Sequence, residues 1–241
     1  MTDRSSSAAY CSDLVRQADE HRWLATRYAS PERRERLIAL YALHHEVRRV
    51  PAAVSEPPLG EIRLQWWRDA VAEIAAGEVK RAHPVVEHVA ATQCVHAGNR
   101  AAIDAAIDAR AHLLYGDVFS SADAAFDWLM TAEGYLADAR AVGEIAQPVR
   151  DRLVAAEAAF VAAHEAVDVA APFEAELEAR AGAEHAALKA ALNVGHAAIP
   201  NEAFPDQLHL SLIPIRLGDD GPFTPLRVRL ALFKAMASGV L

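Results

Sequence analysis

The sequence predicts an all-α protein, and three observations support this prediction. The composition leans toward Ala, Leu, Glu and Arg, which are strong helix formers. Runs of β-branched residues with a period of two, which are typical of strands, are missing. Pro, Gly and Ser stand at intervals expected of helix ends. We therefore expect one helical domain over residues 1–241, with a disordered tail at residues 1–8 and almost no strand.

The helix boundaries follow from these Pro, Gly and Ser residues. Pro31 predicts a helix start, because Pro is favoured in the first turn and Glu32 and Glu35 lie near the positive end of the helix dipole. Pro51 ends that helix. The same interpretation along the chain gives expected helices at residues 9–29, 31–50, 59–77, 84–97, 99–115, 121–141, 147–170, 173–195, 205–217 and 223–238.

Composition narrows the class of protein. The net charge is −9, which argues against nucleic-acid binding through a general basic field. Cys11 and Cys94 have neither metal-binding spacing nor a disulfide framework, which fits a reducing compartment. The N-terminus is polar and Ser-rich, without the apolar region of a secretory signal, and no apolar run approaches the ~20 residues of a membrane span. We expect a cytoplasmic protein that does not span a membrane.

Common catalytic motifs are absent. His45-Glu46 begins like the zinc motif His-Glu-x-x-His, but the fifth position is Arg49. The Glu-x-x-His pairs of di-iron bundles, the Gly-x-Ser-x-Gly nucleophile elbow and Gly-rich phosphate loops are also missing. The sequence therefore predicts no resident metal and no catalytic residue of these classes.

Two neighbouring expected helices carry the candidate binding residues. One apolar face of the helix over 31–50 ends in cations, and the helix over 59–77 carries two adjacent tryptophans. The candidates for anion binding are Arg48, Arg49, Arg63 and Arg68, and those for an apolar cavity are Tyr41, His44, Trp66 and Trp67. Alternatively, these are packing residues and a helix end with favourable charges, with the arginines paired to Glu46, Glu56, Glu61 and Asp69.

Several stretches resemble the squalene/phytoene synthase superfamily of all-α isoprenoid synthases. They include YCSDLVRQADEHRWLA, SPERRERLIALYAL, LQWWRDAV, IDARAHLLYGD and HAALKAALNVGHAAIPNEAFPDQLHLSLIPIRL. The resemblance weakens from about residue 142 to 182, where the chain is shortened relative to the family. The stretch VSEPPLGEIRLQWWRDAV most resembles a divergent branch that includes a mitochondrial respiratory complex I assembly factor and its bacterial relatives.

The resemblance implies a reaction whose metal ligands are missing here. Family members condense two prenyl diphosphates head to head around Mg²⁺, a hard cation held by carboxylates. At the positions of the family's first Asp-rich motif this chain has Arg48, Arg49 and Ala52. Replacing carboxylates by arginines reverses the local charge, so we expect no Mg²⁺ cofactor.

The other two family motifs are also incomplete. The Ser-x-Ser-Phe-Tyr segment that helps to hold diphosphate corresponds to residues 19–23, which contain no serine. Of the second Asp-rich motif only Arg150-Asp151 remains, with Ala155 in place of the second Asp. Three charged residues further along share one helix face, which we expect to be solvated: Glu157, His164 and Asp168.

Three functions stay open. The first is a non-catalytic binding or assembly factor, peripheral at the inner membrane and acting on a membrane-associated protein complex such as a respiratory complex. The second is an active prenyltransferase of the squalene/phytoene type with unusual ligands. The third is a Mg²⁺-independent binder of an isoprenoid or lipid phosphate, in which the arginines hold the phosphate.

Overall fold

The computed structural model describes residues 4–140, 145–164, 167, 169–194, 199–201, 203–218 and 224–241. Over these ranges the elements are helices, and the extended pairing is limited to an isolated bridge between Phe119 and Val169. The all-α prediction is therefore confirmed. None of the helices in these ranges is long and apolar enough to cross a bilayer. The chain divides into two compact units, Met1–Asp117 and Val118–Leu241, so the single-domain organisation stays a prediction.

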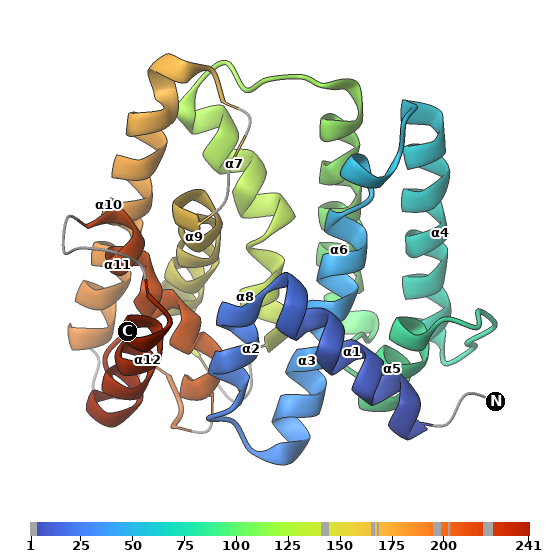
Figure 1. Ribbon diagram of the computed structural model, residues 1–241, viewed down its shortest axis with the longest axis horizontal. Helices are drawn as coiled ribbons and strands as arrows, with labels where there is room; N and C mark the ends of the chain where they lie inside the picture. Colours follow the sequence, from blue (N-terminus) through green and yellow to red (C-terminus); the bar gives the residue numbers. More distant parts are fainter. Residues whose placement is uncertain are drawn as a thin grey trace. The chain divides into compact units, whose positions relative to one another are not determined.

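The first unit is built around α3. Its helices are α1 (Arg4–Ala18), α2 (Glu20–Thr26), α3 (Pro31–Arg48), α4 (Pro57–Ala76), α5 (Pro84–Thr92) and α6 (Ala97–Ala109), with the 3₁₀ turns η1 (Pro51–Ala53) and η2 (Arg110–Tyr115). The second half of α3 is almost wholly buried, and α3 packs against α1 and α5. α4 packs beside α6 and η2 (Figure 1).

Local chemistry explains where the first unit departs from expectation. Residues 4–8, assigned to a disordered tail, belong to α1, where the Ser7 hydroxyl donates to Glu87 at 2.6 Å. The expected helix over 9–29 breaks at Asp19. The Asp19 carboxylate accepts the Arg22 backbone N–H at 3.0 Å and so caps α2. The proline starts were predicted correctly, since Pro31 begins α3 and Pro84 begins α5.

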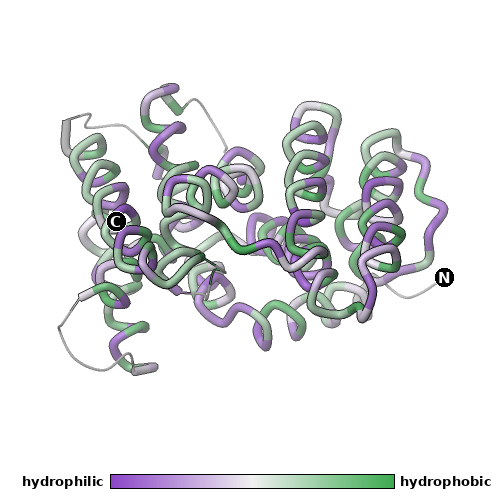
Figure 2. Tube along the Cα trace, turned by 90° about the horizontal axis from the view of Figure 1, so that it is seen from above, coloured by the Kyte–Doolittle hydropathy of each residue, from purple (hydrophilic) through white to green (hydrophobic). Residues whose placement is uncertain are grey.

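The second unit is built around α9. It comprises α7 (Ala122–Ala132), α8 (Tyr135–Arg140), α9 (Gln147–His164), η3 (Ala171–Phe173), α10 (Glu174–Val194), η4 (Phe204–Leu212), α11 (Ile213–Leu217) and α12 (Pro225–Ser238). α9 contacts α7, α8, α10, α11 and η4, and most of its residues are buried. Its many alanines let these neighbours approach closely. Most other helices are amphipathic, with hydrophilic and hydrophobic residues alternating along the tube in Figure 2.

One helix break in the second unit was missed. The expected helix over 121–141 is interrupted at Glu133-Gly134, between α7 and α8. A Cβ at Gly134 would lie 2.4 Å from the Met130 carbonyl oxygen and 2.6 Å from a Val154 methyl carbon. The missing side chain therefore lets the chain turn closely against α9 at this point.

Candidate functional site

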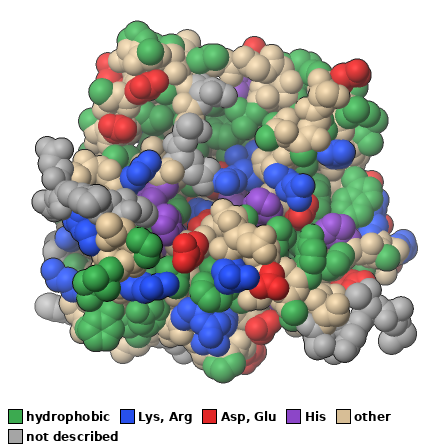
Figure 3. Space-filling model, in the orientation of Figure 1, with side chains coloured by type: hydrophobic (Ala, Val, Ile, Leu, Met, Phe, Trp, Pro, Cys, Tyr) green, Lys and Arg blue, Asp and Glu red, His purple; other side chains and the backbone are tan. Residues whose placement is uncertain are grey.

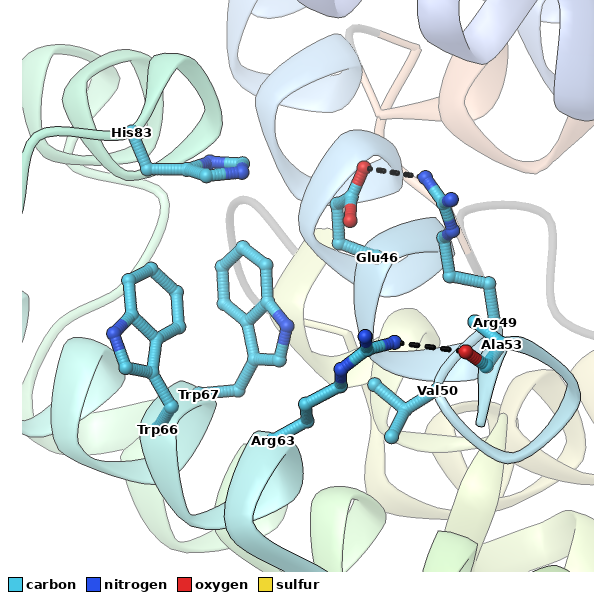
Figure 4. Close-up of a pocket in the computed structure, with 8 residues that line it drawn as sticks. All are labelled: Glu46, Arg49, Val50, Ala53, Arg63, Trp66, Trp67 and His83. Carbon is cyan, nitrogen blue, oxygen red and sulfur yellow. Dashed lines mark hydrogen bonds and ion pairs between the residues drawn. The ribbon is translucent and has the colours of Figure 1, made fainter. Parts of the chain in front are cut away.

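A pocket of about 320 Å³ lies in the first unit, where α3 ends and α4 passes beside it. Its lining comes from the last turn of α3, the connection through η1, the middle of α4 and the residue before α5. The lining residues are Glu46, Arg49, Val50, Ala53, Arg63, Trp66, Trp67 and His83 (Figure 4). Figure 4 shows the two indoles and the imidazole on one side and Glu46, Arg49 and Arg63 on the other.

The helix spacing of α4 brings a cation and an aromatic side chain to the same pocket. Arg63 and Trp67 are four residues apart, and Arg63 and Trp66 three apart, so all three project from one side of the helix. Arg63 donates from Nη1 to the Ala53 carbonyl oxygen at 2.9 Å. This bond ties α4 to η1 and holds the guanidinium at the pocket.

The aromatic side is a cluster of three rings. The Trp66 and Trp67 rings meet edge to face with centroids 4.8 Å apart. The His83 ring lies 5.8 Å from Trp66 and 5.2 Å from Trp67. Arg81 lies over the Trp66 ring at 5.3 Å and pairs with Asp69 and Glu73, so the loop that carries His83 is anchored to α4.

His83 is placed to donate a hydrogen bond. Its Nδ1 accepts the Val85 backbone N–H at 3.2 Å, which caps α5 and leaves the ring proton on Nε2 when the ring is neutral. Burial lowers the pKa of His83, against the opposing influence of Glu46 and Glu87. The neutral ring is therefore favoured at pH 7.

The opposite side of the pocket is rich in cations. The Arg49 guanidinium lies 3.4 Å from the Glu46 carboxylate, and about half of its side chain is exposed. The nearby His45 is influenced by the same cations. Burial first, and then the charges of Arg48, Arg49 and His44, lower the pKa of His45 to about 4. Glu46 is the single carboxylate among the lining residues, and Arg49 already pairs with it.

The structure brings together half of the predicted site residues. Arg49, Arg63, Trp66 and Trp67 line one pocket. The other four candidates, Arg48, Arg68, Tyr41 and His44, are not among its lining residues. Tyr41 and His44 are buried in the core of the first unit. Arg68 pairs with Asp108 of α6 and donates to Gln65 at 2.7 Å, on the outside of α4.

The alternative pairing of the arginines holds for Arg49. Arg49 pairs with Glu46 as that alternative expects, whereas Asp69 pairs with Arg81, and Glu61 accepts a hydrogen bond from Tyr115 at 2.5 Å. Sequence reasoning missed His83 and Arg81. The loop after α4 places both residues beside Trp66. The spacing of residues along a helix cannot predict this position.

The pocket residues do not fit the Mg²⁺ that the resemblance implies. Mg²⁺ prefers several oxygen ligands, and this lining offers one carboxylate beside two guanidiniums. Across the described part of the chain, no three His, Cys, Asp or Glu side chains are grouped so as to hold a metal ion. Asp168, one of the charged residues singled out in the sequence, lies outside the described residues.

The second unit contains a buried charged cluster that the sequence did not reveal. Glu157 of α9 was predicted to lie on a solvated face, and this is wrong, because its side chain is fully buried. The Glu157 carboxylate pairs with Arg140 of α8 and lies 3.0 Å from His209 Nε2 of η4. Arg140 also donates to the Gln207 side-chain oxygen at 2.9 Å. The cluster joins three elements of the second unit around α9.

Comparison with known proteins identifies the class. The model of the squalene/phytoene synthase family matches residues 15–137, just over half of the chain. The chain therefore belongs to the squalene/phytoene synthase family. No curated protein sequence matches it.

A solved structure has a similar fold. The fold is similar to the crystal structure of a dehydrosqualene synthase in complex with a ligand, with a TM-score of 0.67 and 10% sequence identity. The match covers 98% of this chain and 97% of that chain, and at this identity it shows a shared fold alone. α9 and the start of α10 occupy the region where the sequence resemblance weakens, and the shortening expected there stays a prediction.

Proposed function

We propose that this family member is a non-catalytic binding protein whose pocket takes a phosphorylated apolar ligand, of the isoprenoid phosphate class, without Mg²⁺. The observation that supports this proposal is the pairing of two guanidiniums with two indole rings in one pocket of about 320 Å³. Such a lining suits a ligand with an anionic head and an apolar tail.

The cationic side can hold a phosphate directly. A guanidinium has five N–H donors in a planar fork that matches phosphate geometry. Arg63 uses a donor on the Ala53 carbonyl oxygen, and Arg49 uses one on Glu46 at a long 3.4 Å, so both keep donors for a ligand. The Nε2–H of neutral His83 is a further donor in the same lining.

The aromatic side can hold the tail. Trp67 is buried and Trp66 is half-buried, so both indoles present packed apolar faces to the pocket. The volume lies at the small end of ligand pockets, which span ~300–1,000 Å³. We infer that the pocket takes the phosphate and the first part of a chain.

Prenyl condensation is not part of the proposed function. Diphosphate ionisation in this family depends on Mg²⁺, and such metals supply several kcal/mol of charge stabilisation. The positions of the first Asp-rich motif are occupied by Arg48, Arg49 and Ala52. Incubation with farnesyl or geranylgeranyl diphosphate and Mg²⁺ should yield no hydrocarbon, and formation of the C30 or C40 product would contradict the proposal.

Ligand binding is measured by tryptophan fluorescence with farnesyl diphosphate in the presence of EDTA. Quenching of Trp66 and Trp67 should saturate, and Arg63→Gln should weaken binding by about 10–100-fold, the effect of one charge-assisted hydrogen bond. The matched control is Arg100→Gln on α6, since Arg100 pairs with Asp104 away from the pocket. Binding that needs Mg²⁺, or that is equal in both variants, would refute the proposal.

An assembly role is the second candidate. It is supported by the resemblance of VSEPPLGEIRLQWWRDAV to the complex I assembly branch and by the exposed apolar side chains of Leu59 and Ile62 in that stretch, 47% and 66% exposed. Exposed apolar groups of this kind suit contact with a partner protein. Cross-linking in cells should capture respiratory-complex subunits, and Ile62→Asp should abolish their capture. The role would be contradicted if cross-linking captured no respiratory-complex subunits, or if Ile62→Asp left their capture unchanged.

A further inference from the structure

Helix α12 has an apolar stripe that stays exposed within the described part of the second unit. Leu226, Leu230 and Phe233 are 66%, 56% and 63% exposed. At about 100° per residue these positions and Ala237 fall within an arc of about 60° on the helix. Exposed large apolar residues scattered singly are ordinary, whereas an aligned stripe marks an interaction surface.

The stripe is separate from the face that packs in the second unit. Val228, Leu232 and Ala235 are buried on the other side of α12, which packs against η4. Thr224 caps the start of the helix by accepting the Arg227 backbone N–H, and Gly239 ends it with φ 67°. α12 is therefore a formed helix, anchored on one face and open on the other.

Cations flank the stripe on both sides. Arg229 and Lys234 are exposed, and each lies about 40° beyond an edge of the apolar arc. Residues 224–241 contain three basic residues and no acidic one, although the chain as a whole carries a net charge of −9. No ion pair involves Arg229 or Lys234 within the described ranges. Figure 3 shows apolar and basic side chains together over the region of α12 at the lower left.

We propose that α12 docks this protein flat on an anionic lipid surface. An amphipathic helix with Leu and Phe on one face and Lys and Arg beside them lies in the plane of the interface, where the stripe enters the acyl boundary and the cations meet lipid phosphates. With 14 residues α12 is about 21 Å long, too short to span a bilayer. A second copy is a poorer occupant, because a two-fold contact would bring like charges together.

The test measures binding of the protein to vesicles by flotation. One kind of vesicle contains phosphatidylcholine alone, and the other contains phosphatidylcholine and phosphatidylglycerol in equal parts. Binding should require phosphatidylglycerol and weaken at high salt. Arg229→Gln with Lys234→Gln should lower affinity by roughly fivefold per cation, and Leu230→Ser with Phe233→Ser by at least about tenfold. These side chains are exposed, so circular dichroism and the melting temperature should be unchanged.

Matched controls and a direct probe make the outcome decisive. Val118→Ser removes a similarly exposed apolar group from the segment before α7, and Arg100→Gln removes an exposed cation from α6. Both variants should bind vesicles like the parent protein. A polarity-sensitive fluorophore on A237C should shift to the blue on anionic vesicles alone. The proposal would be overturned if the protein bound neither kind of vesicle or bound both equally, or if the α12 variants bound as well as the parent protein. It would also be overturned if Leu230→Ser with Phe233→Ser converted a dimer to a monomer. None of these measurements depends on the pocket. The proposals of ligand binding in the pocket and of membrane docking by α12 are therefore tested independently.

Discussion

The buried carboxylate of Glu157 gives the sharpest prediction for the second unit. Glu157→Gln keeps the shape of the side chain but removes its charge, and so breaks the ion pair with the fully buried Arg140 guanidinium. Breaking a buried ion pair by removing one partner costs about 3–5 kcal/mol. His209 Nε2, 3.0 Å from the same carboxylate, loses part of its interaction as well. We therefore expect Glu157→Gln to lower the free energy of unfolding of this unit by about 3–5 kcal/mol.

A matched carboxylate on the adjacent helix provides the control. Glu184 of α10 pairs with Arg152 of α9 at 3.1 Å, but their side chains are 21% and 47% exposed. Glu184→Gln should cost no more than about 1 kcal/mol, as for other exposed pairs. Hydrogen exchange of the α9 amides under rising urea measures both variants within the second unit. Equal losses for Glu157→Gln and Glu184→Gln would refute the reasoning.

Two further predictions concern stability. Gly134→Ala should destabilise the protein by about 1–3 kcal/mol, because the added Cβ would meet the Met130 carbonyl oxygen. Gly182→Ala within α10 should stabilise the protein by about 0.5–1 kcal/mol, since the nearest contact of its Cβ would be an ordinary 3.7 Å to Leu217. Equal signs in urea unfolding would contradict this contrast. Burial lowers the pKa of His185 to about 4, so the native state binds fewer protons than the unfolded state. Its contribution is complete above pH 6.5 and is lost as the pH falls toward 4, by on the order of 3 kcal/mol. His185→Gln should flatten this dependence in urea titrations at several pH values, and an unchanged profile would count against it.

Local signals in the sequence were enough for much of the fold. Composition and the absence of period-two runs predicted an all-α protein, and prolines such as Pro31 and Pro84 marked helix starts that the structure confirms. Breaks at Asp19 and Gly134 were missed. A single capping carboxylate or a tightly packed glycine acts through its contacts, and these contacts are made only in the folded chain.

The candidate site also has residues that the sequence predicted and residues that only the folded chain brings together. Arg63, Trp66 and Trp67 share one side of a helix, so the sequence could group them by spacing. The loop after α4 places His83 beside these tryptophans. Arg68 lies outside the pocket, where it pairs with Asp108 of α6. These are long-range contacts, which helix periodicity does not encode.

The sequence by itself determined the helical class and the likeness to the squalene/phytoene synthase family, and through that likeness it predicted arginines where the family has carboxylates. Those features depend on residue types and near-neighbour spacing. Only the tertiary structure decided which cations reach one pocket and that Glu157 is buried in an ion pair. The same holds for the apolar stripe of α12, which is exposed in the described part of the second unit. Burial and pairing depend on what distant segments place against a side chain, and the folded chain alone brings those segments together.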